Sequence, residues 1–269
     1  MRFGCCLNMV STGTDGTGIE NIEKLKEAGF DYVELPLAEL ARLRDPERDA
    51  VVGRLKSSGM SCEACNNMFP KTFRLTGPDV RLDEVLAYAE KALAIAGSIG
   101  AKSVVFGSGP AKMVPEGFPM DEGYRQVVSL LKLIDPIAKK NGITIAIEPL
   151  RKAECNLINT FEEGVRLAED VGGDNVRVLV DYYHLTVENE SPEKVIRYGK
   201  GSLVHVHMAN PDGRIFPKSM DESDYRPFFD ALRQIGYEGR VSCEAYSESF
   251  TADAPATLRF FRENMTQEV

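Results

Sequence analysis

The sequence predicts a single (βα)₈ TIM barrel that occupies residues 1–269. The chain has 269 residues, which is a common length for one α/β barrel. Short apolar runs alternate with helical patterns eight times along the chain, and strict alternation of strand and helix is typical of a parallel sheet. No linker or low-complexity stretch divides the chain. Eight such units fit a closed barrel better than an open sheet.

Each predicted strand is a run of β-branched, apolar or small residues. In order, the runs cover residues 2–9, 31–36, 61–67, 103–108, 144–150, 176–184, 203–209 and 239–246. Several runs are preceded by a glycine, which suits the end of a helix because the capping residue there often adopts a left-handed conformation. These glycines are Gly29, Gly59, Gly100, Gly142 and Gly236.

The segments between the strands have helical periodicity. One apolar face is formed by Leu82, Val85, Leu86, Ala89, Leu93 and Ala96, and another by Val127, Leu131, Ile134 and Ala138. Capping residues mark helix starts, such as Thr160 before Phe161 and Ser191 before Pro192. The apolar faces are expected to cover the outer side of the strands.

The composition argues against several kinds of partner. The net charge is −9 and the isoelectric point about 5.1, so the chain should repel the phosphates of a nucleic acid. No basic cluster resembles a membrane-surface patch, and no run approaches the roughly 18 apolar residues of a spanning helix. The N-terminal residues 1–10 are interpreted as a first strand and not as a signal peptide. A cytoplasmic location is expected.

Six cysteines are expected to be buried free thiols in a reducing compartment. Cys62 and Cys65 have the spacing of a zinc knuckle, but residues three apart on a strand point to opposite faces. No second pair follows them. The sequence therefore does not favour a zinc site there.

Four side chains at the ends of successive strands point to one site. They are Glu148, Asp181, His207 and Glu244, on the fifth to the eighth strand. A carboxylate that emerges from a buried strand must be paired, hydrogen-bonded or bound to a metal. Because side chains alternate along a strand, both glutamates should point into the barrel mouth, where the active sites of such barrels lie. Two Glu, one Asp and one His suit one divalent ion, Mn²⁺, Mg²⁺ or Co²⁺, better than a thiolate-rich zinc site does.

The other two histidines, His184 and His205, also fall on the sixth and seventh predicted strands. His205 shares the face of His207 but lies lower in the barrel, so it is expected to be a hydrogen-bonded interior residue. Any one of these polar residues alone would be an ordinary local partner. Their joint position on four successive strands favours a shared site.

The segments IEPL, VDYYH, HVHMA and CEAY resemble the xylose isomerase-like superfamily of sugar isomerases and epimerases. The resemblance covers the whole chain and is nearest to the D-tagatose/D-psicose 3-epimerases and the sugar-phosphate isomerase/epimerase proteins. It implies that Glu148, Asp181, His207 and Glu244 bind one divalent metal. It further implies that Glu154, His184, Arg214 and Tyr246 contact the substrate.

The chain departs from the ketohexose epimerases in one loop. Those enzymes place a tryptophan over the substrate after the fourth strand, whereas this chain has no tryptophan and reads GSGPAKMVPEGFP there. The identity of the sugar therefore does not follow from the resemblance.

Further polar residues could line the site. Glu34 and Asn8 are either polar lining or plain structural residues, and Asn66 begins a long loop that could cover the mouth. Arg214 and Lys218 share a loop that could meet a phosphate. Because no glycine-rich phosphate cradle is present, a neutral sugar or sugar derivative is favoured over a sugar phosphate.

Three functions are compatible with these residues. In the favoured one, Glu148 and Glu244 act as bases in a metal-dependent epimerase or isomerase that transfers a proton through an enediolate. The second is a lyase or dehydratase acting on an inosose or a 3-oxo-glycoside, with His184 or Glu154 as the acid. The third is a non-catalytic sugar-binding barrel.

An endonuclease IV-like activity would need more than three histidines and a less acidic chain. A homodimer or homotetramer is compatible with such a barrel.

Overall fold

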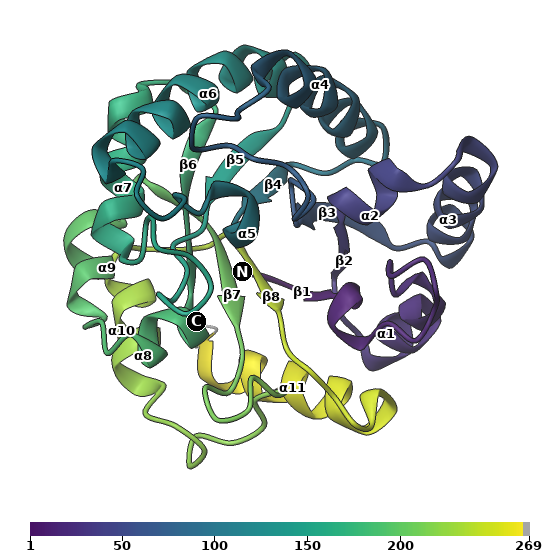
Figure 1. The fold of residues 1–269 in the computed structure, drawn as a ribbon. Helices are drawn as coiled ribbons and strands as arrows, with labels where there is room; N and C mark the ends of the chain where they lie inside the picture. Colours follow the sequence, from purple (N-terminus) through teal and green to yellow (C-terminus); the bar gives the residue numbers. More distant parts are fainter. Residues whose placement is uncertain (266–269) are drawn as a thin grey trace.

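The computed structural model describes residues 1–265 and shows a closed parallel barrel. Neighbouring strands pair in sequence order, and the last strand pairs with the first. The strands are β1 (Arg2–Cys6), β2 (Tyr32–Pro36), β3 (Ser61–Asn66), β4 (Ser103–Phe106), β5 (Thr144–Ile147), β6 (Val176–Asp181), β7 (Leu203–Met208) and β8 (Arg240–Cys243). Figure 1 shows the strands inside a ring of helices. The predicted fold class is confirmed.

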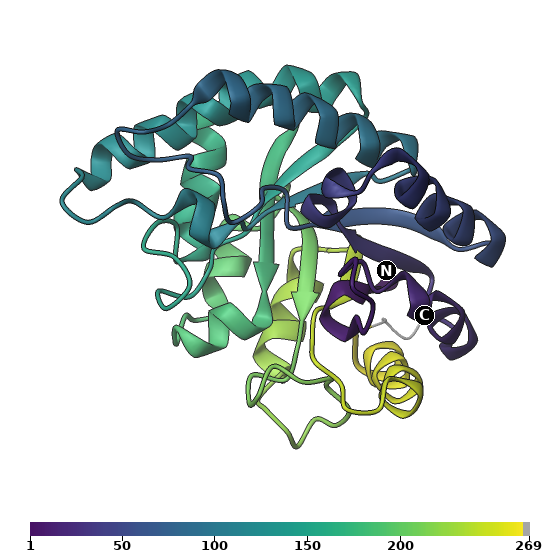
Figure 2. The ribbon, with the colours of Figure 1, turned by 45° about the vertical axis from the view of Figure 1, so that its right-hand side comes forward.

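Helices follow the strands and form the outer layer. The α-helices are α1 (Ile22–Ala28), α2 (Leu37–Arg42), α3 (Asp45–Ser58), α4 (Leu82–Ser98), α5 (Gly109–Lys112), α6 (Met120–Lys140), α7 (Phe161–Val171), α8 (Tyr182–Val187), α9 (Glu193–Tyr198), α10 (Arg226–Gln234) and α11 (Phe250–Met265). Two short 3₁₀ segments, η1 (Leu7–Val10) and η2 (Ile19–Asn21), precede α1. The last helix, α11, packs beside α1 and completes the ring, as both ribbon views show (Figures 1 and 2).

Local sequence signals explain where helices begin and end. Thr160 caps α7 through a capping box with Glu163, as the sequence predicts. Gly29 and Gly59 cap α1 and α3 with positive φ angles of 91° and 71°, a conformation that costs glycine little. The predicted helix ends are confirmed at these positions.

Several strands are shorter than the sequence predicts, and this changes the position of one site residue. The sixth predicted strand, 176–184, ends at Asp181 because the carboxylate of that residue accepts the N–H of Tyr183 at 2.9 Å and caps α8. His184 therefore lies on a short helix and not on a strand. Glu148 and Glu244 stand one residue beyond β5 and β8.

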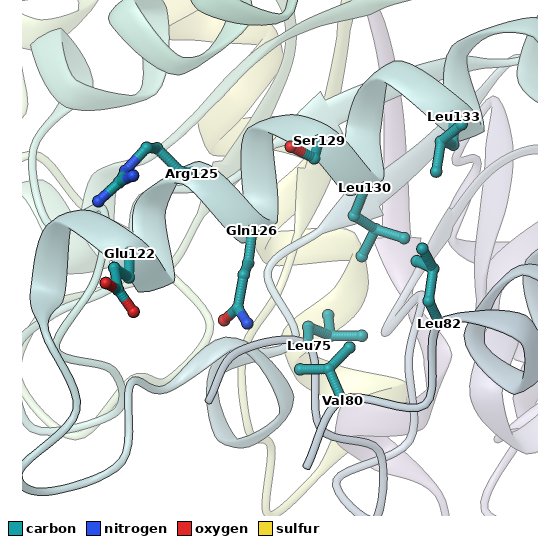
Figure 3. Close-up of a pocket in the computed structure, with 9 residues that line it drawn as sticks. All are labelled: Leu75, Val80, Leu82, Glu122, Arg125, Gln126, Ser129, Leu130 and Leu133. Atoms are coloured by element: carbon teal, nitrogen blue, oxygen red, sulfur yellow. The ribbon is translucent and has the colours of Figure 1, made fainter. Parts of the chain in front are cut away.

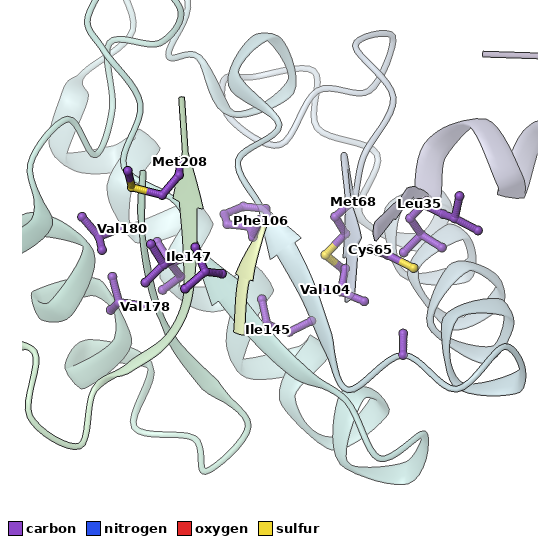
Figure 4. Close-up of a cluster of buried hydrophobic side chains, with 14 of the residues drawn as sticks. Leu35, Cys65, Met68, Val104, Phe106, Ile145, Ile147, Val178, Val180 and Met208 are labelled. Carbon is purple, nitrogen blue, oxygen red and sulfur yellow. The ribbon is translucent and has the colours of Figure 1, made fainter. Parts of the chain in front are cut away.

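The two faces of the strands pack against different surroundings. Ile145 and Ile147 of β5 belong to the large apolar core between strands and helices, part of which Figure 4 shows. Ala146, between them, packs inside the barrel with Val105 and Leu179. The alternation predicted for this strand is confirmed, and it directs Glu148 inward.

All six cysteines are buried and unpaired. Within residues 1–265, no helix is long and apolar enough to cross a membrane.

Candidate active site

The four predicted ligand side chains meet at the carboxyl ends of β5 to β8. They are Glu148, Asp181, His207 and Glu244, and one donor atom of each lies within 4.8 Å of the donor atoms of the other three. All four side chains are buried. The parallel register explains the meeting, because Asp181 pairs with His207 and His207 with Ser242, two residues before Glu244.

The ring of His207 presents one nitrogen to this cluster and the other to a carboxylate behind it. Nδ1 lies 3.1 Å from Glu148 Oε1 and 3.2 Å from Glu244 Oε2. Nε2 lies 3.1 Å from Glu34 Oε1. A carboxylate that accepts the Nε2 proton leaves Nδ1 free to bind a cation, which is the usual support of a metal-ligating histidine.

Glu34 belongs to a buried polar network below His207. Its Oε2 accepts a hydrogen bond from the Ser242 hydroxyl at 2.6 Å and lies 2.8 Å from His205 Nε2. Ser242 Oγ is also 2.8 Å from the hydroxyl of Tyr32. Glu34 is fully buried and lies two residues before the end of β2. A substrate contact of Glu34 stays a prediction, and a side chain at this depth supports His207.

His205 takes the interior position that the sequence predicts. Its Nε2 is engaged by Glu34, while its buried Nδ1 has no hydrogen-bond partner.

The close carboxylates change one another's proton affinity. Burial raises the pKa of Asp181 to about 7, with Arg214 opposing the rise and Glu244 and Glu148 adding to it. Burial disfavours a charged His207, but Glu244 and Glu34 outweigh it and raise the pKa of His207 well above its usual value. The charges of His207 and Arg214 in turn overcome burial and hold the pKa of Glu244 at about 2. The buried negative charges of the cluster are therefore stable only next to a positive charge, which a cation or a protonated His207 can supply.

Arg214 reaches over the cluster from the loop after β7. Its Nη2 lies 2.6 Å from Glu244 Oε2 and 3.3 Å from Asp181 Oδ2, and its guanidinium stands 4.7 Å from the ring centre of Tyr183. The backbone of Arg214 has a φ of 52°, which is uncommon outside glycine. Its buried Nε has no hydrogen-bond partner within the described residues, so this N–H can donate to an oxygen of a bound small molecule.

His184 offers a second donor without a partner. Its Nδ1 accepts the backbone N–H of Arg151 at 3.3 Å, so the ring proton sits on Nε2. Burial and the charge of Arg214 lower the pKa of His184 to about 3, so the ring is neutral. Nε2 is buried and makes no hydrogen bond within the described chain. It is 3.5 Å from Asp181 Oδ2 and can donate to a substrate oxygen beside the cluster.

These groups open into a cavity of about 850 Å³. Glu148, Glu154, His184, Arg214 and Glu244 line its floor, and its walls include Asn8, Asn67, Phe69, Pro70, Pro110 and Leu150. The predicted loop after β3 therefore does border the site. The volume lies in the range of small-molecule sites, which combine apolar walls with few polar groups.

Three other predicted residues do not line the cavity. Asn66 is buried and donates to Asn8 Oδ1 at 2.9 Å and to Glu244 Oε1 at 3.3 Å, so it holds one of the four predicted ligand side chains. The side chain of Tyr246 is 55% exposed and is not part of the cavity lining. Its backbone N–H donates to the Arg214 carbonyl at 2.8 Å. Lys218 Nζ pairs with Asp253 at 3.0 Å. Neither side chain borders the cavity, and contacts of Tyr246 with substrate and of Lys218 with a phosphate stay predictions.

A second hollow lies on the helical layer and not at the barrel mouth. It has a volume of about 460 Å³ and is lined by α6 and the segment that enters α4, including Leu75, Leu82, Gln126 and Leu133 (Figure 3). None of the predicted site residues borders it. The cavity over the cluster of Glu148, Asp181, His207 and Glu244 is therefore the candidate active site.

Comparison with known proteins agrees with this architecture. The sequence profile described as xylose isomerase-like TIM barrel matches residues 22–264. The chain belongs to this family. It is 26% identical over 229 residues to the L-ribulose 3-epimerase of Mesorhizobium japonicum, which covers 82% of this chain and 73% of the relative. It is 25% identical over 251 residues to the 3-dehydro-D-guloside 4-epimerase of Escherichia coli, which covers 88% and 89%.

The fold of this xylose isomerase-like chain matches solved structures closely. A crystal structure of D-psicose 3-epimerase in the presence of D-fructose superposes with a TM-score of 0.84, at 23% identity, over 98% of this chain and 99% of the other. The family resemblance predicted from the strand-end motifs is confirmed.

Some residues around the site of this xylose isomerase-like chain were missed by sequence reasoning. Lys112 is fully buried next to Glu148, although its segment was interpreted as a loop. Cys6 Sγ lies 3.9 Å from His207 Nε2. A lysine followed by an apolar run gives no signal of burial, since lysine is almost always exposed.

Proposed function

We propose that this protein is a divalent-metal-dependent epimerase of a ketose or a keto-sugar derivative. The observation that best supports the proposal is the placement of Glu148 and Glu244 against one ring nitrogen of His207, at 3.1 and 3.2 Å. Both carboxylates face the same cavity. The family relatives named above act on sugars and carry the name epimerase, and this supports the same class of reaction here.

The four-residue cluster fits a divalent cation. Glu148, Asp181, His207 and Glu244 would hold it, and three carboxylates with one imidazole suit Mn²⁺, Mg²⁺ or Co²⁺. A bound cation supplies Lewis acidity toward the oxygens of a sugar carbonyl. One structure of the same fold, the IOLI protein, is described with a bound zinc atom, which supports a cation in this kind of barrel without indicating which ion it is.

Glu148 and Glu244 are the groups that move the proton. A C–H bond beside a carbonyl is weakly acidic, and a positioned carboxylate can remove its proton to give an enediolate. In epimerisation one carboxylate takes the proton from one face of the carbon and the other returns a proton to the opposite face. The two environments differ in a way that suits this division: burial and Glu244 raise the pKa of Glu148, whereas His207 and Arg214 hold that of Glu244 at about 2.

His184, Arg214 and Glu154 would orient the sugar. The Nε2–H of His184 and the Nε–H of Arg214 are buried donors without partners, and hydroxyl or carbonyl oxygens of a sugar would satisfy them. Glu154 borders the same cavity and lies 3.8 Å from Arg214 Nη1. These contacts would fix which carbon faces the two glutamates.

The lyase hypothesis is less well supported. It needs an acid beside a leaving group, and the low pKa of His184 leaves that ring neutral and a weak proton donor at neutral pH. A phosphorylated sugar is also less well supported, because Lys218 is engaged by Asp253. A neutral sugar or sugar derivative therefore remains the proposed substrate class.

The experiment that tests the proposal is a substrate panel read by NMR. Ketoses, ketose phosphates and 3-keto-glycosides are incubated with the protein and Mn²⁺, and in parallel with a chelator. The proposal expects one substrate pair that differs at a single carbon beside the carbonyl, interconverted only with the metal. Conversion that is unaffected by the chelator, or an unsaturated product, would contradict it.

A further inference from the structure

Lys112 is a fully buried lysine beside the candidate metal cluster. It ends the short helix α5, which follows β4, and its Nζ donates to the backbone carbonyl of Glu148 at 3.0 Å. The same Nζ stands 5.5 Å from the ring centre of Phe106. A lysine is almost never fully buried without a partner, and the carbonyl of Glu148 is the partner here.

The sheet register shows what the lysine replaces. In a parallel pair of strands, every second residue of one strand bonds to the other strand: its N–H donates to the residue before its partner, and its carbonyl accepts from the residue after its partner. Thr144 and Ala146 pair with Ser103 and Val105, and Glu148 continues the pattern by donating its N–H to the Phe106 carbonyl at 3.3 Å. The carbonyl of Glu148 should then receive the N–H of Ser108.

This hydrogen bond from Ser108 to Glu148 is missing because β4 has already ended. Ser108 adopts a left-handed conformation, with φ 41° and ψ 44°, and starts α5. No bond joins its N–H to Glu148 in the part of the chain that the structure describes. Lys112 thus supplies the donor that the sheet would otherwise provide.

The same segment also confines the side chain of Glu148. A Cβ atom at Gly107 would lie 2.2 Å from Glu148 Oε2, and one at Gly109 would lie 2.8 Å from the Glu154 carbonyl. The chain can pass this close to both glutamates only without side chains at these two positions. Residues 107–112 therefore hold the carboxylate of Glu148 from one side and its carbonyl from the other.

We propose that Lys112 is a positioning residue that fixes Glu148 for cation binding and proton transfer. The inference rests on the proposed function, since it assigns Lys112 a role toward the same site. Without the Lys112 bond the residue after β5 has one backbone anchor in place of two, and its carboxylate can drift from the cluster. Burial lowers the pKa of Lys112, but the ammonium and the amine both carry N–H donors, so the bond does not depend on the charge.

The test compares K112M with the control T76V. Thr76 is also buried, and its Oγ1 donates to the carbonyl of Met113 at 2.7 Å and lies 3.4 Å from the carbonyl of Lys112. T76V therefore disturbs the backbone of the same segment without removing the Lys112 side chain or a contact to Glu148. Mn²⁺ affinity is measured by calorimetry and the melting temperature of each chelated protein is recorded. K112M is expected to weaken Mn²⁺ binding roughly 10–100-fold, as the loss of a supporting partner commonly does. T76V is expected to lower the melting temperature while its Mn²⁺ affinity stays near wild type.

An affinity of K112M within about threefold of wild type would overturn the inference, and so would an equal loss of affinity in T76V. If K112M does not fold, K112Q replaces it, because its side chain is one atom shorter and leaves the carbonyl out of reach. The same two outcomes then apply. A wild-type protein that binds no Mn²⁺ would instead count against the proposed function itself, which separates the two failures.

Discussion

Replacement of Glu34 by glutamine should weaken cation binding, although Glu34 is not one of the four predicted ligands. Its carboxylate has three neighbours: Oε2 is 2.6 Å from the Ser242 hydroxyl and 2.8 Å from His205 Nε2, and Oε1 is 3.1 Å from His207 Nε2. An ionised carboxylate can only accept hydrogen bonds, so all three neighbours must donate. The direction of the His207 bond is what leaves its Nδ1 free for a cation.

A glutamine must put an NH₂ group in place of one oxygen, and neither orientation suits the neighbours. If the NH₂ group faces His207, the ring must move its proton to Nδ1 and loses its ligand atom. If it faces Ser242 and His205, two buried donors lose their acceptor at a cost of about 1–3 kcal/mol each. Loss of such a supporting partner commonly weakens metal binding about 10–100-fold, which corresponds to about 1.4–2.8 kcal/mol.

The assay is Mn²⁺ titration by calorimetry on the wild type, E34Q and the control E63Q. Glu63 is a β3 carboxylate that pairs with Arg2 at 2.5 Å and with Arg240 at 2.7 Å, at the opposite end of the barrel. E63Q should bind Mn²⁺ like wild type. An E34Q protein with wild-type circular dichroism and a dissociation constant within about threefold of wild type would refute the reasoning.

Further predictions concern the cluster itself. E148Q and E244Q should each lower turnover about 10²–10⁴-fold with the fold intact, since an amide keeps the shape but is no base; near-normal turnover of either variant removes that glutamate from catalysis. H184A should raise KM and keep its metal, whereas H207A should lose metal, and equal metal contents in the two purified proteins would contradict these roles. Mn²⁺ affinity should rise with pH up to about 7 and then flatten if only Asp181 titrates, because below that pH the cation must displace the Asp181 proton. Displacement of a proton from His207 would extend the rise to higher pH. A pH-independent dissociation constant from about pH 5.5 to about pH 8 would be the contrary result.

The four cluster residues can be predicted from the sequence because two simple rules place them. Alternation along a strand directs Glu148 and Glu244 inward, and strand order in a barrel brings Asp181 and His207 between them. The first rule uses neighbours within a few positions of the chain, and the second needs only the order of the strands. This is why the cluster assembles as expected although no sequence repeat marks the strands.

Residues whose roles depend on barrel closure could not be predicted in this way. Glu34 and His207 are 173 positions apart. Their contact depends on how far along β2 and β7 the two residues lie in the closed barrel. Lys112 could not be predicted either. Its partner is the backbone carbonyl of Glu148, which receives no hydrogen bond from the neighbouring strand because β4 has ended. Tyr246 lies three residues beyond the end of β8, where the two-residue period of a strand no longer determines the direction of a side chain.

Deuterium wash-in during turnover tests directly whether Glu148 and Glu244 transfer the proton. The reaction is run in D₂O with Mn²⁺ and the substrate identified by the panel, and the product is read by mass spectrometry and NMR. A proton held by Glu148 or Glu244 can exchange with solvent before it is returned, and in epimerisation the returned proton comes from a different carboxylate. The account predicts one deuterium at the carbon beside the carbonyl in the epimerised product. Product that retains its original hydrogen at full conversion would contradict proton transfer by the two glutamates.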